Sequence, residues 1–210
     1  MQGMGNTNPT KETKKSMIET TIRLTGVTPL LMHADTLADP ISQETKAFKK
    51  VSSKRTKTDE DYERMALLEF RAALYWDNGP VVPNRNLMRC LIDGGKLTKS
   101  GTKVERGLVV VGQHFELKFG GFKGEMEKDA LYADKNFVSR MTVKVGQART
   151  VRCRPIFKNW SVTVPLLLDG TQLAEDTLLD IAKDAGAMVG LGDYRRGGGF
   201  GRFKVEKITK

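Results

Sequence analysis

Residues 190–203 spell GLGDYRRGGGFGRF, and this stretch organises the interpretation of the chain. Glycine allows positive φ and a close approach of the backbone to a ligand. Arginine carries a planar fork of donors that matches phosphate, and Tyr194 and Phe200 are suited to stack on bases. The stretch lies between a helix-like and a strand-like pattern, whereas flexible linkers are rich in glycine and serine. We therefore predict an ordered phosphate-binding loop, with a flexible glycine-rich linker as the alternative.

The composition favours a polyanionic partner. The chain has 210 residues and a formal net charge of +10, with 29% charged residues, which favours nucleic acid over a membrane surface. No run of apolar residues is long enough for a transmembrane helix. Cys90 and Cys153 are far apart, which suggests a reducing cytoplasm and neither a disulfide framework nor a zinc site, so we expect both to be buried. Residues 1–16 lack an apolar signal core and are predicted to be a disordered tail.

Hydrophobic periodicity predicts a series of strands and helices. The expected strands are 18–25, 81–82, a pair formed by 108–111 and 114–119, a hairpin over 137–158 that turns near Gly146, a central strand at 160–168, and 203–208. The expected helices begin at 58–61 and end through Gly and Pro at 77–80, begin at Asn84 as the N-cap, and begin at Thr171 or Asp176. Residues 96–107 and 125–135 are expected to be a basic loop and an exposed acidic connection.

Three segments resemble the RAMP superfamily, the RNA-binding proteins of CRISPR systems. Residues 190–205 are similar to its C-terminal glycine-rich loop, and 82–92 to its short strand, proline and helix, with Asn-Arg-Asn where the family has Gly-Ser-Ser. The basic hairpin at 137–158 is similar to the projecting thumb of the backbone subunits that coat guide RNA in multi-subunit (class 1) effectors.

This resemblance implies a function and a set of partners. It implies sequence-independent binding of single-stranded guide RNA, polymerisation of the chain into a helical filament on that RNA, and association with other effector subunits. It also implies a cytoplasmic ribonucleoprotein of antiviral defence, without a cofactor and without a membrane. A non-polymerising single-strand-binding module, and a viral mimic that inhibits a CRISPR complex, stay open as alternatives.

The fold expected from the order of the patterns is α+β. Without the hairpin, the order is βαββαβ, which predicts a ferredoxin-like core with an inserted basic β-hairpin and a C-terminal glycine-rich loop. We expect a single RAMP-like domain over 17–210, with insertions at about 42–58 and 120–160.

The candidate RNA-binding residues are cations, glycines and one aromatic ring. They are Arg195, Arg196, Arg202, Gly198, Gly199 and Phe200 of the loop, Arg85 and Arg89 of the predicted helix, Arg149, Arg152 and Arg154 of the hairpin, and Lys49 and Lys50 of the basic segment 42–57. The hairpin carries six cations and no acid, more than the one or two charges that would guard a strand edge. For segment 42–57, a solvated charged surface is an equal alternative.

Asp35 is the one candidate catalytic residue. It lies in the loop after the first strand. In the RAMP backbone subunits of type III effectors, which this chain resembles, an aspartate at a comparable place cuts target RNA. The alternative function is therefore a metal-dependent endoribonuclease that uses Asp35. A polar turn is the preferred interpretation, because aspartate is common in turns and no catalytic partner is evident in the sequence. His33 and His114 each stand alone, which is more typical of structural than of catalytic or metal-binding histidines.

Overall fold

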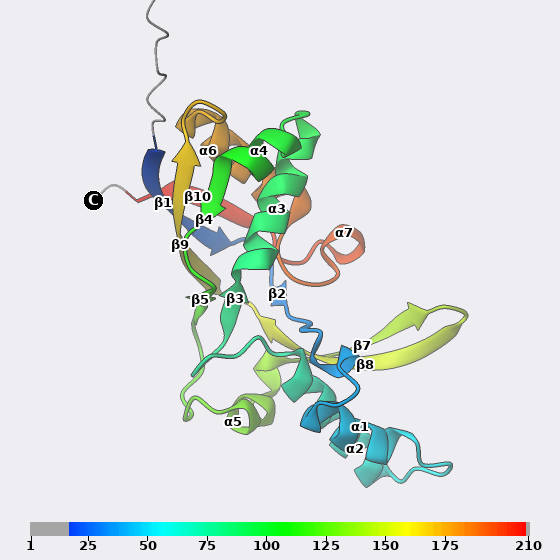
Figure 1. Cartoon of the computed structure of the whole chain (residues 1–210). Helices are drawn as coiled ribbons and strands as arrows, with labels where there is room; N and C mark the ends of the chain where they lie inside the picture. The colour runs from blue at the N-terminus through cyan, green and yellow to red at the C-terminus, as the bar shows by residue number, and fades with distance from the viewer. Residues whose placement is uncertain (1–16, 209–210) are drawn as a thin grey trace, which may run out of the picture.

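The computed structural model describes residues 17–208, with only the backbone of Val145 included. The tail predicted for residues 1–16 lies outside the described residues. The chain forms a mixed α+β structure with antiparallel sheets. In Figure 1 the largest sheet and its helices occupy the upper part, further helices occupy the lower part, and a long hairpin projects from between them. No described helix is long and apolar enough to span a lipid bilayer.

Five strands form the main sheet, with β10-β1-β9-β4 as its order and β6 also paired to β9. They are β1 (Met17–Gly26), β4 (Leu108–Val110), β6 (Lys118–Phe119), β9 (Trp160–Asp169) and β10 (Phe203–Lys207), and all pairs are antiparallel. The period-two pattern of β1 buries Ile22 and Leu24 and exposes Arg23, as predicted. Because β9 pairs with three other strands, the prediction of a central strand there is confirmed.

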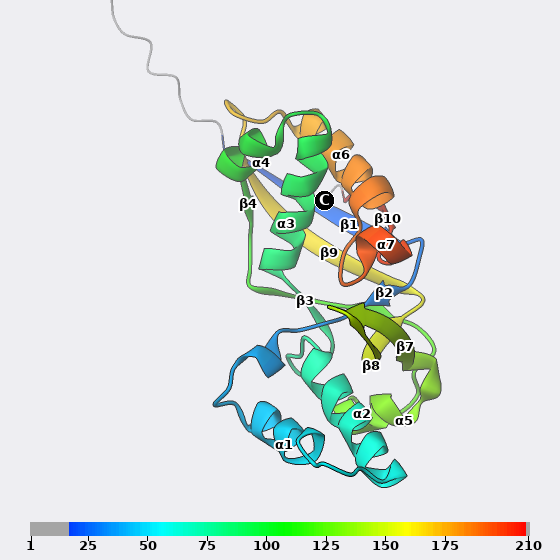
Figure 2. The same ribbon diagram turned by 90° about the vertical axis from the view of Figure 1, so that its right-hand side faces the viewer.

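Helices lie against one face of the main sheet (Figure 2). They are α3 (Asn84–Leu97), α4 (Gly101–Gly107) and α6 (Glu175–Asp184), which continues into a π-helix over Ala185–Val189. Gly94 of α3 faces the end of α6, and a Cβ at Gly94 would lie 2.5 Å from the Cβ of Ala185. Glycine therefore permits the close packing that brings α3 beside the chain segment following α6.

The lower part consists of helices and two small sheets. The helices are α1 (Gln43–Ser52), α2 (Asp59–Ala73), α5 (Lys128–Ala133) and the 3-10 turns Thr36–Ala38 and Lys135–Phe137. One sheet pairs β2 (Leu30–Leu31) with β8 (Ala148–Phe157) and β8 with β7 (Val138–Val145); the other pairs β3 (Val81–Pro83) with β5 (His114–Glu116). A capping box starts α2, since Thr58 and Asp61 exchange backbone and side-chain hydrogen bonds at 3.2 and 3.3 Å. This confirms the predicted helix start.

The prediction of a strand pair between 108–111 and 114–119 is wrong. β4 and β6 each pair with β9, and β5 pairs with β3. Gly112, at a φ of 120°, turns the chain out of the main sheet, and its lack of a Cβ leaves room for the ring of Phe115. The short segments on either side of this turn therefore pair with different strands, β4 and β6 with β9 and β5 with β3.

Helices occupy two segments that were predicted to be a loop and an exposed connection, and one segment for which no secondary structure was predicted. The expected basic loop at 96–107 contains α4, and the expected exposed connection at 125–135 contains α5. The segment 42–58 contains α1, whose N-cap Ser42 accepts a hydrogen bond from Thr45 N at 3.1 Å. In α5, the fully buried Leu131 and the ring of Tyr132, 5.2 Å from that of Phe70, pack against the core. The acidic residues around them led to the prediction of an exposed connection.

Asn84 does not cap α3, contrary to the prediction. It is the first helical residue, and Pro83 occupies the cap position. The Asn84 amide instead donates to the carbonyl oxygens of Val110, at 2.7 Å, and Gly112, at 2.6 Å. The side chain thus ties the start of α3 to the end of β4. The preceding helix also stops early, because α2 ends at Ala73 rather than at 77–80.

Other local predictions are confirmed. β7 and β8 form the expected hairpin, with Gly146 in its turn at a φ of 60°. Cys90 and Cys153 are both buried free thiols. The last strand, β10, follows the glycine-rich stretch directly and pairs with β1.

Candidate nucleic-acid interface

The glycine-rich loop, residues 190–202, is hydrogen-bonded to β2 and to the turn that precedes it. Asp193 N donates to Leu31 O at 2.7 Å, and Gly201 N donates to Pro29 O at 2.8 Å. Gly201 has a φ of 67°, and a Cβ on it would overlap the carbonyl oxygen of Leu191. These contacts require glycine and hold both ends of the loop, so its conformation is set by its neighbours.

A single helical turn, α7 (Arg195–Gly198), forms the exposed tip of the loop. Tyr194 precedes it and is 48% exposed, and its ring centroid lies 6.1 Å from that of Phe200. A Cβ on Gly198 would overlap the Tyr194 ring, so glycine here lets the ring fold over the turn. Arg202 points inward, because its guanidinium donates to Arg195 O at 3.3 Å. Arg202 therefore supports the loop from within.

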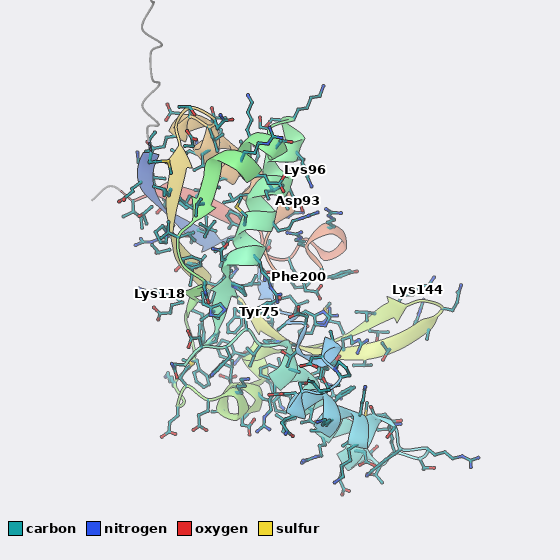
Figure 3. The ribbon with its side chains drawn as sticks, viewed as in Figure 1. Tyr75, Asp93, Lys96, Lys118, Lys144 and Phe200 are labelled. Atoms are coloured by element: carbon teal, nitrogen blue, oxygen red, sulfur yellow. The ribbon has the colours of Figure 1, made fainter. Side chains whose placement is uncertain are left out.

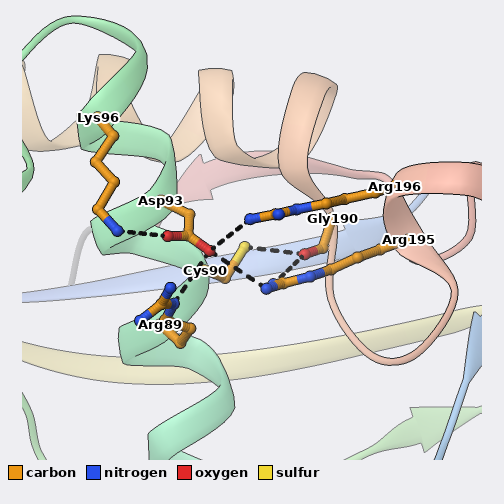
Figure 4. Close-up of polar contacts among 7 residues, drawn as sticks. All are labelled: Arg89, Cys90, Asp93, Lys96, Gly190, Arg195 and Arg196. Atoms are coloured by element: carbon orange, nitrogen blue, oxygen red, sulfur yellow. Dashed lines mark hydrogen bonds and ion pairs between the residues drawn. The ribbon is translucent and has the colours of Figure 1, made fainter.

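One carboxylate, Asp93 of α3, gathers four cations (Figure 4). Lys96 Nζ lies 3.0 Å from Asp93 Oδ1, and three arginines lie near Oδ2, at 3.2 Å for Arg89, 3.3 Å for Arg195 and 3.6 Å for Arg196. Arg89 and Lys96 come from α3, whereas Arg195 and Arg196 come from α7. We call these four side chains the cation cluster. Its positive charges outnumber the single negative charge, so the surface beside the glycine-rich loop carries a surplus.

The cation cluster has a buried centre and an exposed rim. The Asp93 side chain is 6% exposed, while those of Arg196 and Arg89 are 78% and 61% exposed. Burial alone would raise the pKa of Asp93, but hydrogen bonds from Lys96 and Arg89 outweigh it and hold the pKa below its usual value. Asp93 is therefore ionised at neutral pH and keeps the cations together, while the outer guanidinium groups stay open to solvent.

Cys90 adds a second link between α3 and the glycine-rich loop. Its Sγ lies 3.2 Å from Gly190 O, within hydrogen-bond range. Burial raises the pKa of the thiol to about 12, so it stays protonated and able to donate. Neither this contact nor the link from Asp93 to Arg195 and Arg196 was evident in the sequence, because each joins residues about one hundred positions apart.

The base of the hairpin is neutralised by acids from other elements. Arg152 NH1 lies 2.9 Å from Glu69 Oε1, and Arg140 NH1 lies 2.6 Å from Glu63 Oε1, both acids being on α2. Arg154, which is 12% exposed, pairs with Asp193 of the glycine-rich loop. The hairpin itself carries no acid, but the fold supplies its counter-charges and thereby fixes its base to the body.

The tip of the hairpin differs from its base. Lys144 and Arg149 are cross-strand partners and both are exposed. Within residues 17–208, no carboxylate is in ion-pair range of either side chain. Figure 3 shows Lys144 at the far end of the projecting hairpin, well away from the main sheet. The tip is therefore an exposed basic end that the fold leaves unneutralised within this part of the chain.

Asp35 lies in a turn and is engaged by Arg85. Its Oδ1 accepts a hydrogen bond from Arg85 NH2 at 2.7 Å, and the two side chains are 67% and 60% exposed. This hydrogen bond lowers the pKa of Asp35. The side chain makes no capping hydrogen bond to the 3-10 turn that follows. In the described residues, no group of three or more His, Cys, Asp or Glu side chains is arranged to hold a metal ion.

Lys49 and Lys50 lie on α1, in the lower part of the molecule, and both are exposed. In Figure 2 α1 and α7 lie at well-separated heights, so the structure does not bring these lysines to the cation cluster. The candidates that do converge are Arg89, Arg195 and Arg196, with Gly198, Gly199 and Phe200 beside them.

Comparison with known protein families and with curated proteins found no match for this chain. What the site can do therefore follows from its own geometry. It offers exposed guanidinium groups, a rigid loop and aromatic rings. These are the components that hold the phosphates and stack on the bases of a nucleic acid strand.

Proposed function

We propose that this protein binds single-stranded RNA independently of its sequence, through the cation cluster and the glycine-rich loop. The observation that carries the proposal is the arrangement of four cations around one buried carboxylate. One cation would be enough to balance the charge of Asp93. The surplus here favours a polyanion, and the exposed guanidinium groups of Arg89 and Arg196 present donors that phosphate oxygens can reach from solvent.

The aromatic rings favour a single strand over a duplex. Tyr194 and Phe200 lie beside the cation cluster, within one loop. Base stacking on such rings requires bases that are not already stacked in a helix. Phosphate contacts with aromatic stacking give little sequence discrimination, since every base has a π-face.

We further propose a ferredoxin-like core of the kind that RAMP proteins have. The strand order β10-β1-β9-β4, with α3 between β1 and β4 and α6 between β9 and β10, supports this assignment. On this view the chain is a backbone subunit that polymerises along guide RNA in a CRISPR-type ribonucleoprotein. The projecting hairpin would then reach toward the RNA or the next subunit, which is consistent with its unneutralised tip.

A matched pair of double variants tests the binding surface. Arg89→Gln with Arg196→Gln removes the two most exposed guanidinium groups of the cation cluster. Arg23→Gln with Lys204→Gln removes two exposed cations from β1 and β10, on the face of the main sheet that the helices leave open. In fluorescence anisotropy titrations, the first pair should weaken RNA binding at least tenfold and reduce the slope of log K against log salt by about 1.4, the share of two phosphate contacts. The control pair should leave the slope almost unchanged.

An equal loss in both pairs would mean that binding follows net charge alone, and the site assignment would fail. Polymerisation has its own readout, because affinity should rise stepwise with RNA length as more copies align. A binding curve independent of length would identify a non-polymerising single-strand-binding module instead.

A further inference from the structure

A small hollow lies beside the cation cluster. Its volume is about 150 Å³, and His33, Tyr75, Asn86, Arg89, Asp193 and Arg195 line it together with Gly192. Arg89 and Arg195 thus belong both to the cation cluster and to this hollow. Pockets that enclose a whole small molecule typically measure ~300–1,000 Å³, so this hollow fits one fragment of a longer ligand.

The charges around the hollow favour an anionic ligand. Asp193 is its one acid, and Arg154 already neutralises that carboxylate. Burial, and then the charge of Arg154, lower the pKa of His33 against the opposing effect of Asp193, so the imidazole is neutral at physiological pH. Arg89 and Arg195 share the remaining acid, Asp93, with two further cations. A phosphate next to Arg89 and Arg195 would therefore meet a net positive surface.

Two uncharged side chains of the hollow suit a nucleobase. Tyr75 also lines a neighbouring hollow and lies under the guanidinium of Arg85, with 5.9 Å between the Arg85 Cζ and the ring centroid. Its hydroxyl donates to His33 O at 3.2 Å, which fixes the ring. Asn86 on the first turn of α3 is partly exposed, and within residues 17–208 its amide has no hydrogen-bond partner. An amide presents a donor and an acceptor together, the pair that reads a base edge.

We propose that this hollow takes a single nucleotide of the bound strand, with its phosphate at Arg89 and Arg195, its base against Tyr75, and the base edge hydrogen-bonded to Asn86. This assignment rests on the proposed function, since it requires RNA on this face. It adds a base preference at one position to binding that is otherwise sequence-independent. The ligand class is a nucleoside monophosphate unit within single-stranded RNA.

Homopolymers test the base preference. The full-length protein is titrated with oligo(A), oligo(C) and oligo(U) of equal length, and the tightest and weakest should differ by about fivefold, as expected for one discriminating contact. Asn86→Ala should reduce this spread to less than about twofold and leave the salt slope unchanged. Asn159→Ala, an exposed asparagine in the turn between β8 and β9, is the matched control and should keep the spread.

Variants of Tyr75 give a second, independent test of the pocket. Tyr75→Leu should weaken binding of all three homopolymers about fivefold through the loss of stacking. Tyr75→Phe keeps the ring but loses the hydrogen bond to His33 O, so it should lose much less affinity than Tyr75→Leu. Thermal melts of each variant confirm that the fold is retained, and Asn86→Ala decides the matter if Tyr75→Leu does not fold.

The outcomes separate the two proposals. Salt-dependent RNA binding with the same homopolymer spread in Asn86→Ala as in the unmodified protein would overturn the nucleotide pocket and leave the proposed function standing. A protein that binds no RNA at all would overturn the proposed function, and the pocket assignment with it.

Discussion

Gly201 in the glycine-rich loop and Gly146 at the tip of the hairpin adopt nearly the same backbone conformation, with φ values of 67° and 60°. Their surroundings are opposite. A Cβ on Gly201 would overlap the backbone of Leu191, whereas a Cβ on Gly146 would meet nothing within 4 Å. The same left-handed glycine conformation therefore occurs in a packed loop at Gly201 and in an open, projecting turn at Gly146.

The charges of the two regions differ in the same way. In the cation cluster, four side chains share Asp93 across two elements. In the hairpin, each basal arginine has its own acid and the tip cations have none in the described part of the chain. We infer that the loop region is built to hold cations in fixed positions, while the hairpin is anchored at its base and left free to make contacts at its end.

Substituting the two glycines should give the largest difference. An alanine in the left-handed conformation costs about 1–2 kcal/mol, and this is all that Gly146→Ala should lose in the free energy of unfolding. Gly201→Ala carries the same cost and also forces the loop off the backbone of Leu191, so its loss should be several kcal/mol. Urea denaturation measures both. Equal losses would show that the loop can relax away from β1 and β2, and that it is no more fixed than the hairpin turn.

Removing the acid of the cation cluster should have an intermediate effect. Asp93→Asn should reduce the free energy of unfolding by about 1–3 kcal/mol at pH 7, because charge-assisted hydrogen bonds are lost and four cations stay close together. The folded-state pKa of Asp93 is lowered, so its contribution is complete above the ordinary carboxyl pKa of about 3.9 and disappears as the pH falls through the folded value. The difference between the two proteins should therefore shrink in acid.

Asp180→Asn is the control for this effect. Among residues 17–208, Asp180 pairs with Lys183 alone, 2.9 Å away, and its side chain is 74% exposed. An exposed pair of this kind contributes ~0–1 kcal/mol at most. If Asp180→Asn were as destabilising as Asp93→Asn at pH 7, the burial of Asp93 and its four partners would add nothing to the free energy of unfolding beyond an exposed ion pair.

The smallest effect on stability is expected at the hairpin tip. Lys144→Gln with Arg149→Gln should change the free energy of unfolding by less than ~0.5 kcal/mol, since both side chains are exposed and lack ion pairs within residues 17–208. The same variant should still bind RNA with a nearly full salt slope, but its subunits should be irregularly spaced on long RNA in electron micrographs. Normal spacing would remove the hairpin tip from the contacts between subunits.

Local patterns were sufficient for several elements. The helix start at 58–61, the alternation of β1 and the turn at Gly146 each depend on interactions within a few residues, and each was predicted. Predictions failed where a segment had no strong preference of its own. Residues 114–119 do not pair with 108–111, because β5 pairs with β3 and β6 pairs with β9. The segment that contains α5 is not an exposed connection, because Leu131 is buried in the core.

In the candidate site, too, some features follow from the sequence alone and others from tertiary packing. The sequence by itself determined the ordered glycine-rich loop, its arginines and the basic hairpin, because residue type and short spacing fix positive φ, charge and turn geometry. Only the tertiary structure decided which cations from different elements act together. Asp93 joins Arg89 to Arg195 and Arg196, and α2 neutralises the base of the hairpin, because packing α3 against the end of α6 and β8 against α2 sets which charges meet. Helical spacing alone places Arg89 and Lys96 beside Asp93 within α3. The pairs that join α3 to α7 and the hairpin to α2 depend on distances in space that only the packing of these elements sets.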